Sequence, residues 1–73
     1  MDNNTMRLTL KAIRVNHGMT QKNAAKGLGV STTTLSAWEN GTVYPKVPDI
    51  TKIEKFYGVN YADINFLPEK TSE

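Results

Sequence analysis

Hydrophobic residues recur along this chain at intervals of three and four, whereas the strict alternation of a half-buried strand is almost absent. These intervals predict short helices that each turn one apolar side inward. We expect five helices, over residues 6–16, 21–28, 32–40, about 48–57 and a short segment between Asn60 and Pro68. The sequence therefore predicts an all-α fold, a single domain over residues 1–73 with its core at about 6–67.

Polar residues and glycines mark the ends of the predicted helices. A Ser, Thr or Asn before a helix can accept a hydrogen bond from an unpaired backbone N–H, and a glycine beyond it permits the left-handed turn that ends it. The candidate caps are Thr5, Thr20, Ser31 and Asn60, and the candidate stops are Gly18, Gly29, Gly41 and Gly58. Asp63 follows Asn60 by three residues, which is the spacing of a capping box.

The apolar positions predict a small core. Its expected members are Leu10, Ile13, Ala24, Ala25, Leu28, Leu35, Trp38, Ile50, Ile53 and Tyr57. Gly27 interrupts this pattern: a glycine inside a helix costs about 1 kcal/mol relative to alanine, and no other feature of the sequence accounts for it. Four later residues either close the core or join two copies of the chain, and both interpretations stay open; they are Tyr61, Ile64, Phe66 and Leu67.

The middle two helices carry the most specific spacing in the chain. Six residues at successive separations of 4, 4, 1, 5 and 3 form the set Gln21, Ala25, Gly29, Val30, Leu35 and Trp38. Two helices that cross steeply through a short turn need a small residue where their backbones meet, which Ala25 supplies. Gly29 permits a left-handed turn, and Leu35 and Trp38 can pin the second helix onto the first. The spacing predicts a helix-turn-helix.

The run TQKNAAKGLGVSTTTLSAWENG resembles the helix-turn-helix of the phage-repressor family, the Cro/CI or Xre-like DNA-binding domains. The resemblance continues on both sides, through Leu10, Ile13, Arg14, Gly18, Met19, Pro45, Ile50, Ile53, Tyr57, Gly58 and Val59, and covers about residues 6–67. It implies a five-helix, lambda-repressor-like fold and sequence-specific regulation of transcription. It also implies that the third helix enters the DNA major groove, usually as part of a homodimer on a near-palindromic operator.

The third helix opens with hydroxyl residues, which are mediocre helix formers. In a recognition helix the N-terminal residues reach base edges, where threonine methyls can pack on thymine methyls and hydroxyls can bond to bases or phosphates. The expected base-contacting residues are Gln21, Thr32, Thr33, Ser36 and Ala37. For the threonines, an inert surface is the alternative. Gln21 could equally be an ordinary polar first-turn residue.

A second group of residues is expected to contact phosphates, which fix register but carry little sequence information. It comprises Thr20, Lys22, Lys26, Ser31, Asn40, Thr42, Tyr44 and Lys46. Capping is the main expected role of Ser31, and for the two helix-two lysines a solvated surface is the alternative. The resemblance further implies a partly buried structural ion pair between Arg14 and Glu39.

Charge and composition narrow the function. The net charge is +2, and basic residues dominate between Arg7 and Lys46, where Glu39 is the single acid. The chain has no cysteine and one histidine, His17, which leaves no thiolate or histidine cluster for a metal and little for an enzyme. We expect a non-enzymatic protein of the bacterial cytoplasm or nucleoid. Its expected partners are double-stranded DNA and a second copy, without a cofactor, small-molecule ligand or membrane; a protein-interaction module on the same fold, such as an antitoxin or antirepressor, is the alternative.

Overall fold

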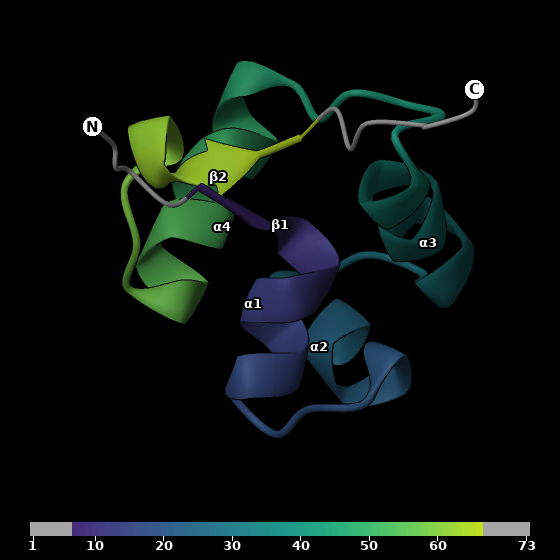
Figure 1. The fold of residues 1–73 in the computed structure, drawn as a ribbon. Helices are drawn as coiled ribbons and strands as arrows, with labels where there is room; N and C mark the ends of the chain where they lie inside the picture. The colour runs from purple at the N-terminus through teal and green to yellow at the C-terminus, as the bar shows by residue number, and fades with distance from the viewer. Residues whose placement is uncertain (1–6, 67–73) are drawn as a thin grey trace, which may run out of the picture.

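Four α-helices make up most of the molecule. The computed structural model describes residues 7–66, and its elements run β1 (Leu8–Thr9), α1 (Leu10–Asn16), α2 (Gln21–Leu28), α3 (Thr32–Asn40), α4 (Val47–Tyr57), a 3-10 helix (Tyr61–Asp63) and β2 (Ile64–Asn65) (Figure 1). The mostly helical architecture and the four α-helix positions agree with the periodicity. The number of helices does not, because four α-helices are present in the described range instead of five.

The start of the first helix was predicted wrongly. The helix begins at Leu10 and is capped by Thr9, whose Oγ1 accepts a hydrogen bond from Ala12 N at 3.1 Å. Thr5, the predicted cap, lies outside the described residues. The physical reason is a contact between residues far apart in the chain. Leu8 and Thr9 are extended because they pair in parallel with Ile64 and Asn65. In Figure 1, β1 leads directly into α1 and β2 runs beside it.

The predicted fifth helix is a single 3-10 turn followed by a strand. Asn60 makes no side-chain cap there, and the bond between it and Asp63 runs from Asp63 N to the Asn60 backbone oxygen at 2.9 Å. The N-terminus of the turn is instead held by Glu54 of α4, whose Oε2 accepts from Tyr61 N at 2.7 Å. Pro68, the predicted stop, lies outside the described residues.

The core joins all four α-helices to the C-terminal strand. Its buried apolar members are Leu10, Ile13, Ala24, Ala25, Leu28, Leu35, Trp38, Ile53, Tyr57, Ile64 and Phe66, with Ile50 packed against them and half-buried. Ile64 and Phe66 therefore close the core, whereas Tyr61 is 44% exposed. Leu67 lies outside the described residues.

Gly27 has a tertiary explanation. A Cβ at this position would overlap the Phe56 ring of α4 and lie 2.5 Å from its Cζ. The glycine therefore lets α2 and α4 approach closely around an aromatic ring, which offsets its cost within the helix.

Candidate nucleic-acid interface

Local caps define the two helices of the helix-turn-helix. The Thr20 hydroxyl accepts from Asn23 N at 3.0 Å, and the Ser31 hydroxyl accepts from Thr34 N at 3.0 Å. Between the helices, Gly29 adopts φ 76°, ψ 29°, a left-handed conformation that favours glycine. Val30 N then donates to Ala25 O at 3.0 Å, which closes the turn in the manner of a Schellman motif.

The outward side of α3 forms one continuous surface with the start of α2 and the loop that follows α3. A shallow hollow there is lined by Gln21, Thr32, Thr33, Ser36, Ala37, Asn40 and Thr42, and we call these seven residues the reading surface. The structure brings together all five residues predicted to contact bases. Thr32 and Thr33 are exposed, while Gln21, Ser36 and Ala37 are half-buried.

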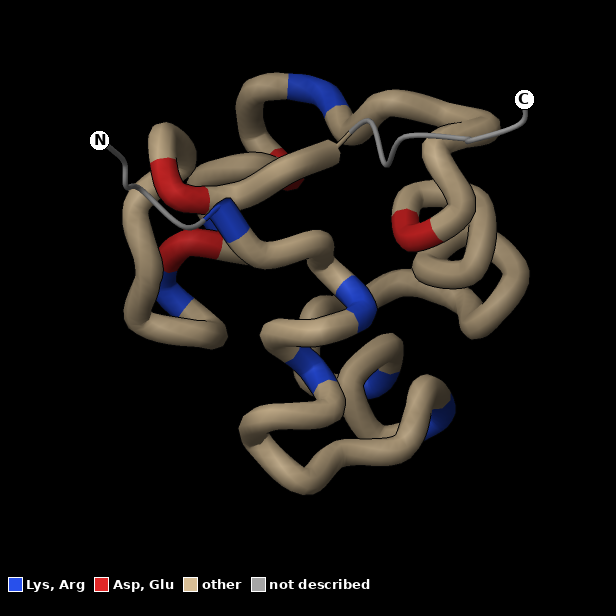
Figure 2. The backbone as a smooth tube through the Cα atoms, in the orientation of Figure 1, with Lys and Arg blue, Asp and Glu red and all other residues tan. Residues whose placement is uncertain are grey.

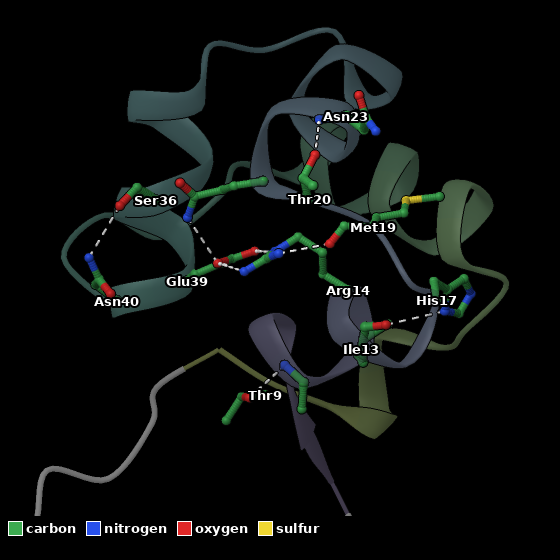
Figure 3. Close-up of polar contacts among 12 residues, drawn as sticks. Thr9, Ile13, Arg14, His17, Met19, Thr20, Asn23, Ser36, Glu39 and Asn40 are labelled. Atoms are coloured by element: carbon green, nitrogen blue, oxygen red, sulfur yellow. Dashed lines mark hydrogen bonds and ion pairs between the residues drawn. The ribbon is translucent and has the colours of Figure 1, made fainter.

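A buried ion pair lies beneath the reading surface and ties α3 to α1. Arg14 Nε donates to Glu39 Oε2 at 2.7 Å, Nη2 donates to Oε1 at 3.3 Å, and Nη1 donates to Met19 O at 2.9 Å. Figure 3 shows Arg14 extended between Glu39 and Met19. The hydrogen bond to Glu39 raises the pKa of Arg14 above its ordinary value, so the guanidinium keeps its charge.

Glu39 also reaches the reading surface. Its Oε1 accepts a hydrogen bond from Gln21 Nε2 at 3.1 Å, so one carboxylate connects α1, α2 and α3. Gln21 was predicted to contact bases, but the sequence did not indicate this bond to Glu39, because residues 18 positions apart carry no local signal of their contact.

Two aromatic features near this network were also missed. The Tyr57 hydroxyl is buried and has no hydrogen-bond partner among residues 7–66, and burial, followed by the charge of Glu39, raises the pKa of Tyr57 to about 12. His17 is exposed, and its ring contacts Ile13 O at 3.2 Å and Tyr57 O at 3.1 Å, joining the ends of α1 and α4.

The residues predicted to contact phosphate fall into two groups. The first group is exposed: Asn40 and Thr42 belong to the reading surface, and Lys22, Lys26 and Lys46 lie outside it. The side chains of Thr20 and Ser31 serve as helix caps, and the Tyr44 hydroxyl is 2.8 Å from that of Tyr61. In Figure 2, Lys and Arg lie along α1 and α2, with further ones before β1, before α4 and within α4, whereas the described acids other than Glu39 lie in α4 and the following turn. The two lysines of α4 are outnumbered by the three acids of α4 and that turn, so the net positive charge lies on α1 and α2.

No helix within residues 7–66 is long and apolar enough to span a membrane.

Comparison with known proteins adds independent evidence. The helix-turn-helix family model matches residues 10–64. The cryptic phage CTXphi transcriptional repressor RstR of Vibrio cholerae is 38% identical over 55 residues, which are 75% of this chain and 50% of the repressor. The HTH-type transcriptional regulator MJ0272 of Methanocaldococcus jannaschii is 44% identical over 59 residues, 81% of this chain and 89% of that protein.

In a third relative the matching residues make up a smaller share of the protein. The HTH-type transcriptional activator BcrR of Enterococcus faecalis is 34% identical over 55 residues, 75% of this chain and 27% of the activator. This chain thus spans only half of RstR and less of BcrR. No solved structure matches it. The family match covers the whole of the architecture from α1 to β2, and the chain belongs to the helix-turn-helix family.

Proposed function

We propose that this protein is a sequence-specific, double-stranded DNA-binding regulator of transcription that places α3 in the major groove. The observation that carries the proposal is the reading surface itself. Seven uncharged side chains form one outward surface, five of them, all small, on α3, whose opposite side is buried, with Gln21 of α2 and Thr42 of the following loop beside them. Side chains of this size let a helix lie deep in a groove about 12 Å wide. The names of the three relatives, a repressor, a regulator and an activator, support the same class of function.

Affinity would come from the phosphates. Lys22 and Lys26 of α2 and Lys46 before α4 are exposed, and Lys22 directly follows Gln21 of the reading surface. Each lysine that neutralises a phosphate releases a counterion, so binding should weaken linearly in log salt. In this proposal the lysines supply affinity and fix the register on DNA, and α3 contacts the bases that define the sequence.

The proposed binding form is a homodimer, at least on DNA. Tyr44, Val47 and Tyr61 are 45%, 75% and 44% exposed, and they line one groove together with Pro45 and Ile50. Exposed apolar groups gathered in this way favour contact with a second protein surface. A second copy is the proposed occupant, because the groove adjoins the loop after α3 and a two-fold pair would present two α3 helices to a near-palindromic site. Repression by occupying a promoter is the proposed outcome, as the name of RstR suggests for that relative.

A salt titration of binding to random-sequence duplexes, with selection and sequencing of the retained DNA, tests the proposal. The expected result is an enriched near-palindromic site whose log affinity falls linearly with log salt. Lys22→Ala should weaken binding to all sequences and reduce the salt slope by about one. Lys55→Ala, an exposed lysine in the last turn of α4, is the matched control and should leave the slope unchanged. Absence of enrichment would contradict the proposal and favour a protein-interaction module.

A further inference from the structure

The reading surface contains no charged residue. All seven of its described residues are Thr, Ser, Ala, Asn or Gln. The commonest specific contact in the major groove is a bidentate bond from Arg or Lys to guanine, and this surface has no side chain that could make it. The reading surface therefore cannot recognise guanine through an Arg or Lys side chain.

Both amide side chains of the reading surface are engaged within the protein. Gln21 Nε2 donates to Glu39 Oε1 at 3.1 Å, and Asn40 Nδ2 donates to Ser36 Oγ at 3.4 Å. Ser36 and Asn40 lie one turn apart on α3 (Figure 3). An amide nitrogen carries two N–H donors, so each of these bonds leaves a second N–H and the oxygen of the amide to face the DNA, in an orientation that the bond fixes. For Gln21 the bond that fixes it is to a buried carboxylate.

The other groups of the reading surface are hydroxyls and methyls. Thr32, Thr33 and Thr42 each carry a methyl beside a hydroxyl, and Ala37 carries a methyl alone. Hydroxyls donate or accept and so discriminate bases weakly. Methyls have one apolar counterpart in the major groove, the C5-methyl group of thymine.

We propose that this surface recognises thymine C5-methyl groups, so that the half-site contains A·T pairs where it meets Thr32 and Thr33. This inference rests on the proposed function. It predicts weaker binding to DNA in which uracil replaces thymine, because uracil pairs as thymine does but lacks the methyl. Burial of one methyl-sized group contributes about 0.8 kcal/mol, so each lost contact should weaken binding about fourfold.

The test uses the duplex obtained by random-pool selection, synthesised again with one thymine at a time replaced by uracil. We expect about fourfold weaker binding at one or more positions in each half-site, and little change elsewhere. Replacing a sensitive T·A pair by 5-methylcytosine·G should weaken binding less than replacing it by C·G, because 5-methylcytosine carries a C5-methyl group as thymine does and cytosine does not.

Two matched variants assign the contact to protein atoms. Thr33→Ser removes only the methyl, and Thr33→Val keeps it and removes the hydroxyl; the same pair applies to Thr32. At one of these positions, Thr→Ser should lose about fourfold on the thymine duplex and lose nothing further on uracil, whereas Thr→Val should keep the sensitivity to uracil. Since both threonines are exposed, all four variants should keep the wild-type thermal midpoint.

The outcomes separate the two proposals. An enriched site that binds equally well with uracil at every position would overturn this inference and leave the regulator intact. An enriched site without A·T pairs opposite α3 would do the same. Failure to enrich any sequence would overturn both.

Discussion

The two sides of α3 have opposite compositions and serve opposite purposes. The inner side, Leu35, Trp38 and Glu39, is at most 6% exposed and is packed or ion-paired to α1 and α2. The outer side begins with Thr32 and Thr33, which are exposed and contribute nothing to the core. A nine-residue helix is too short to be stable alone. The inner side therefore holds the helix in place. Because the helix does not depend on its outer side for stability, that side can carry poor helix formers.

The ion pair also explains why the two sides are not independent. Glu39 belongs to the inner side, yet its Oε1 accepts the bond that orients Gln21 on the reading surface. A change on the inner side can therefore affect the proposed DNA binding in two ways, by unfolding the domain or by releasing Gln21. The five predictions that follow test the two sides of α3 and the packing around them, and they run from the largest expected change in stability to the smallest.

Glu39→Ala should lower the free energy of unfolding by about 3–5 kcal/mol, because it leaves the buried Arg14 guanidinium without its carboxylate partner. Urea unfolding followed by circular dichroism would measure the change. Asn40→Ala, at the next residue but exposed, is the control and should change stability by no more than about 0.5 kcal/mol. Equal effects of the two substitutions would break the distinction between the two sides of α3.

Gly27→Ala should lower stability by about 1 kcal/mol, although alanine is the better helix former. Its methyl would collide with the Phe56 ring, and overpacking of this kind costs about 1–3 kcal/mol, more than the propensity gain of about 1 kcal/mol. The same substitution in a Phe56→Leu background should be neutral or stabilising. This position lies away from the reading surface, so DNA affinity of the folded protein should not change; thermal unfolding and a binding titration at low temperature would check both points.

Tyr57→Phe should raise the stability at pH 7 by about 1 kcal/mol, since it removes a buried hydroxyl that has no partner among the described residues. Tyr44→Phe is the contrasting variant, because it removes a hydroxyl that is bonded to Tyr61, and it should give no gain. A loss of stability in Tyr57→Phe would indicate that the hydroxyl is satisfied in solution.

The same residue gives a dependence on pH. The pKa of Tyr57 is raised to about 12 from an ordinary 10.0, so the folded chain holds this proton more tightly than the unfolded chain does. Tyr57 ionises at a lower pH in the unfolded chain than in the folded chain. The free energy of unfolding therefore falls as pH rises from about 10 to about 12. The free energy of unfolding of the wild type should therefore fall more steeply over this interval than that of Tyr57→Phe, as measured by urea unfolding at a series of pH values.

Thr33→Ala should have the smallest effect on stability, within about 0.5 kcal/mol, because the side chain is exposed and alanine favours the helix. Its effect should appear in DNA binding, as a smaller ratio of affinity for the selected site over random DNA. Equal losses on both kinds of DNA would contradict its proposed role in reading bases. Together with Glu39→Ala, this variant tests whether fold and specificity reside on opposite sides of one helix.

The helix-turn-helix was predictable from the sequence because its signals are local. Thr20 and Ser31 cap the helices that follow them within three residues, and Gly29 and Gly41 end them with left-handed turns. The core positions of these helices followed from their periodicity, and Leu35 and Trp38 are buried as expected. The ends of the molecule were predicted less well. A strand of two residues has no detectable alternation, and β1 exists only because β2, 56 positions later, pairs with it.

The sequence by itself determined where the four α-helices lie, where α2 and α3 begin and end, and which side of each faces the core, since caps and periodicity act within one or two turns of the chain. Tertiary structure alone decided that Thr9 starts α1, that Gly27 makes room for Phe56, and that Gln21 is held by Glu39. Each of these depends on two residues that are distant in the chain and meet only when the helices pack. Their contact is a property of the fold as a whole, which no short stretch of sequence encodes.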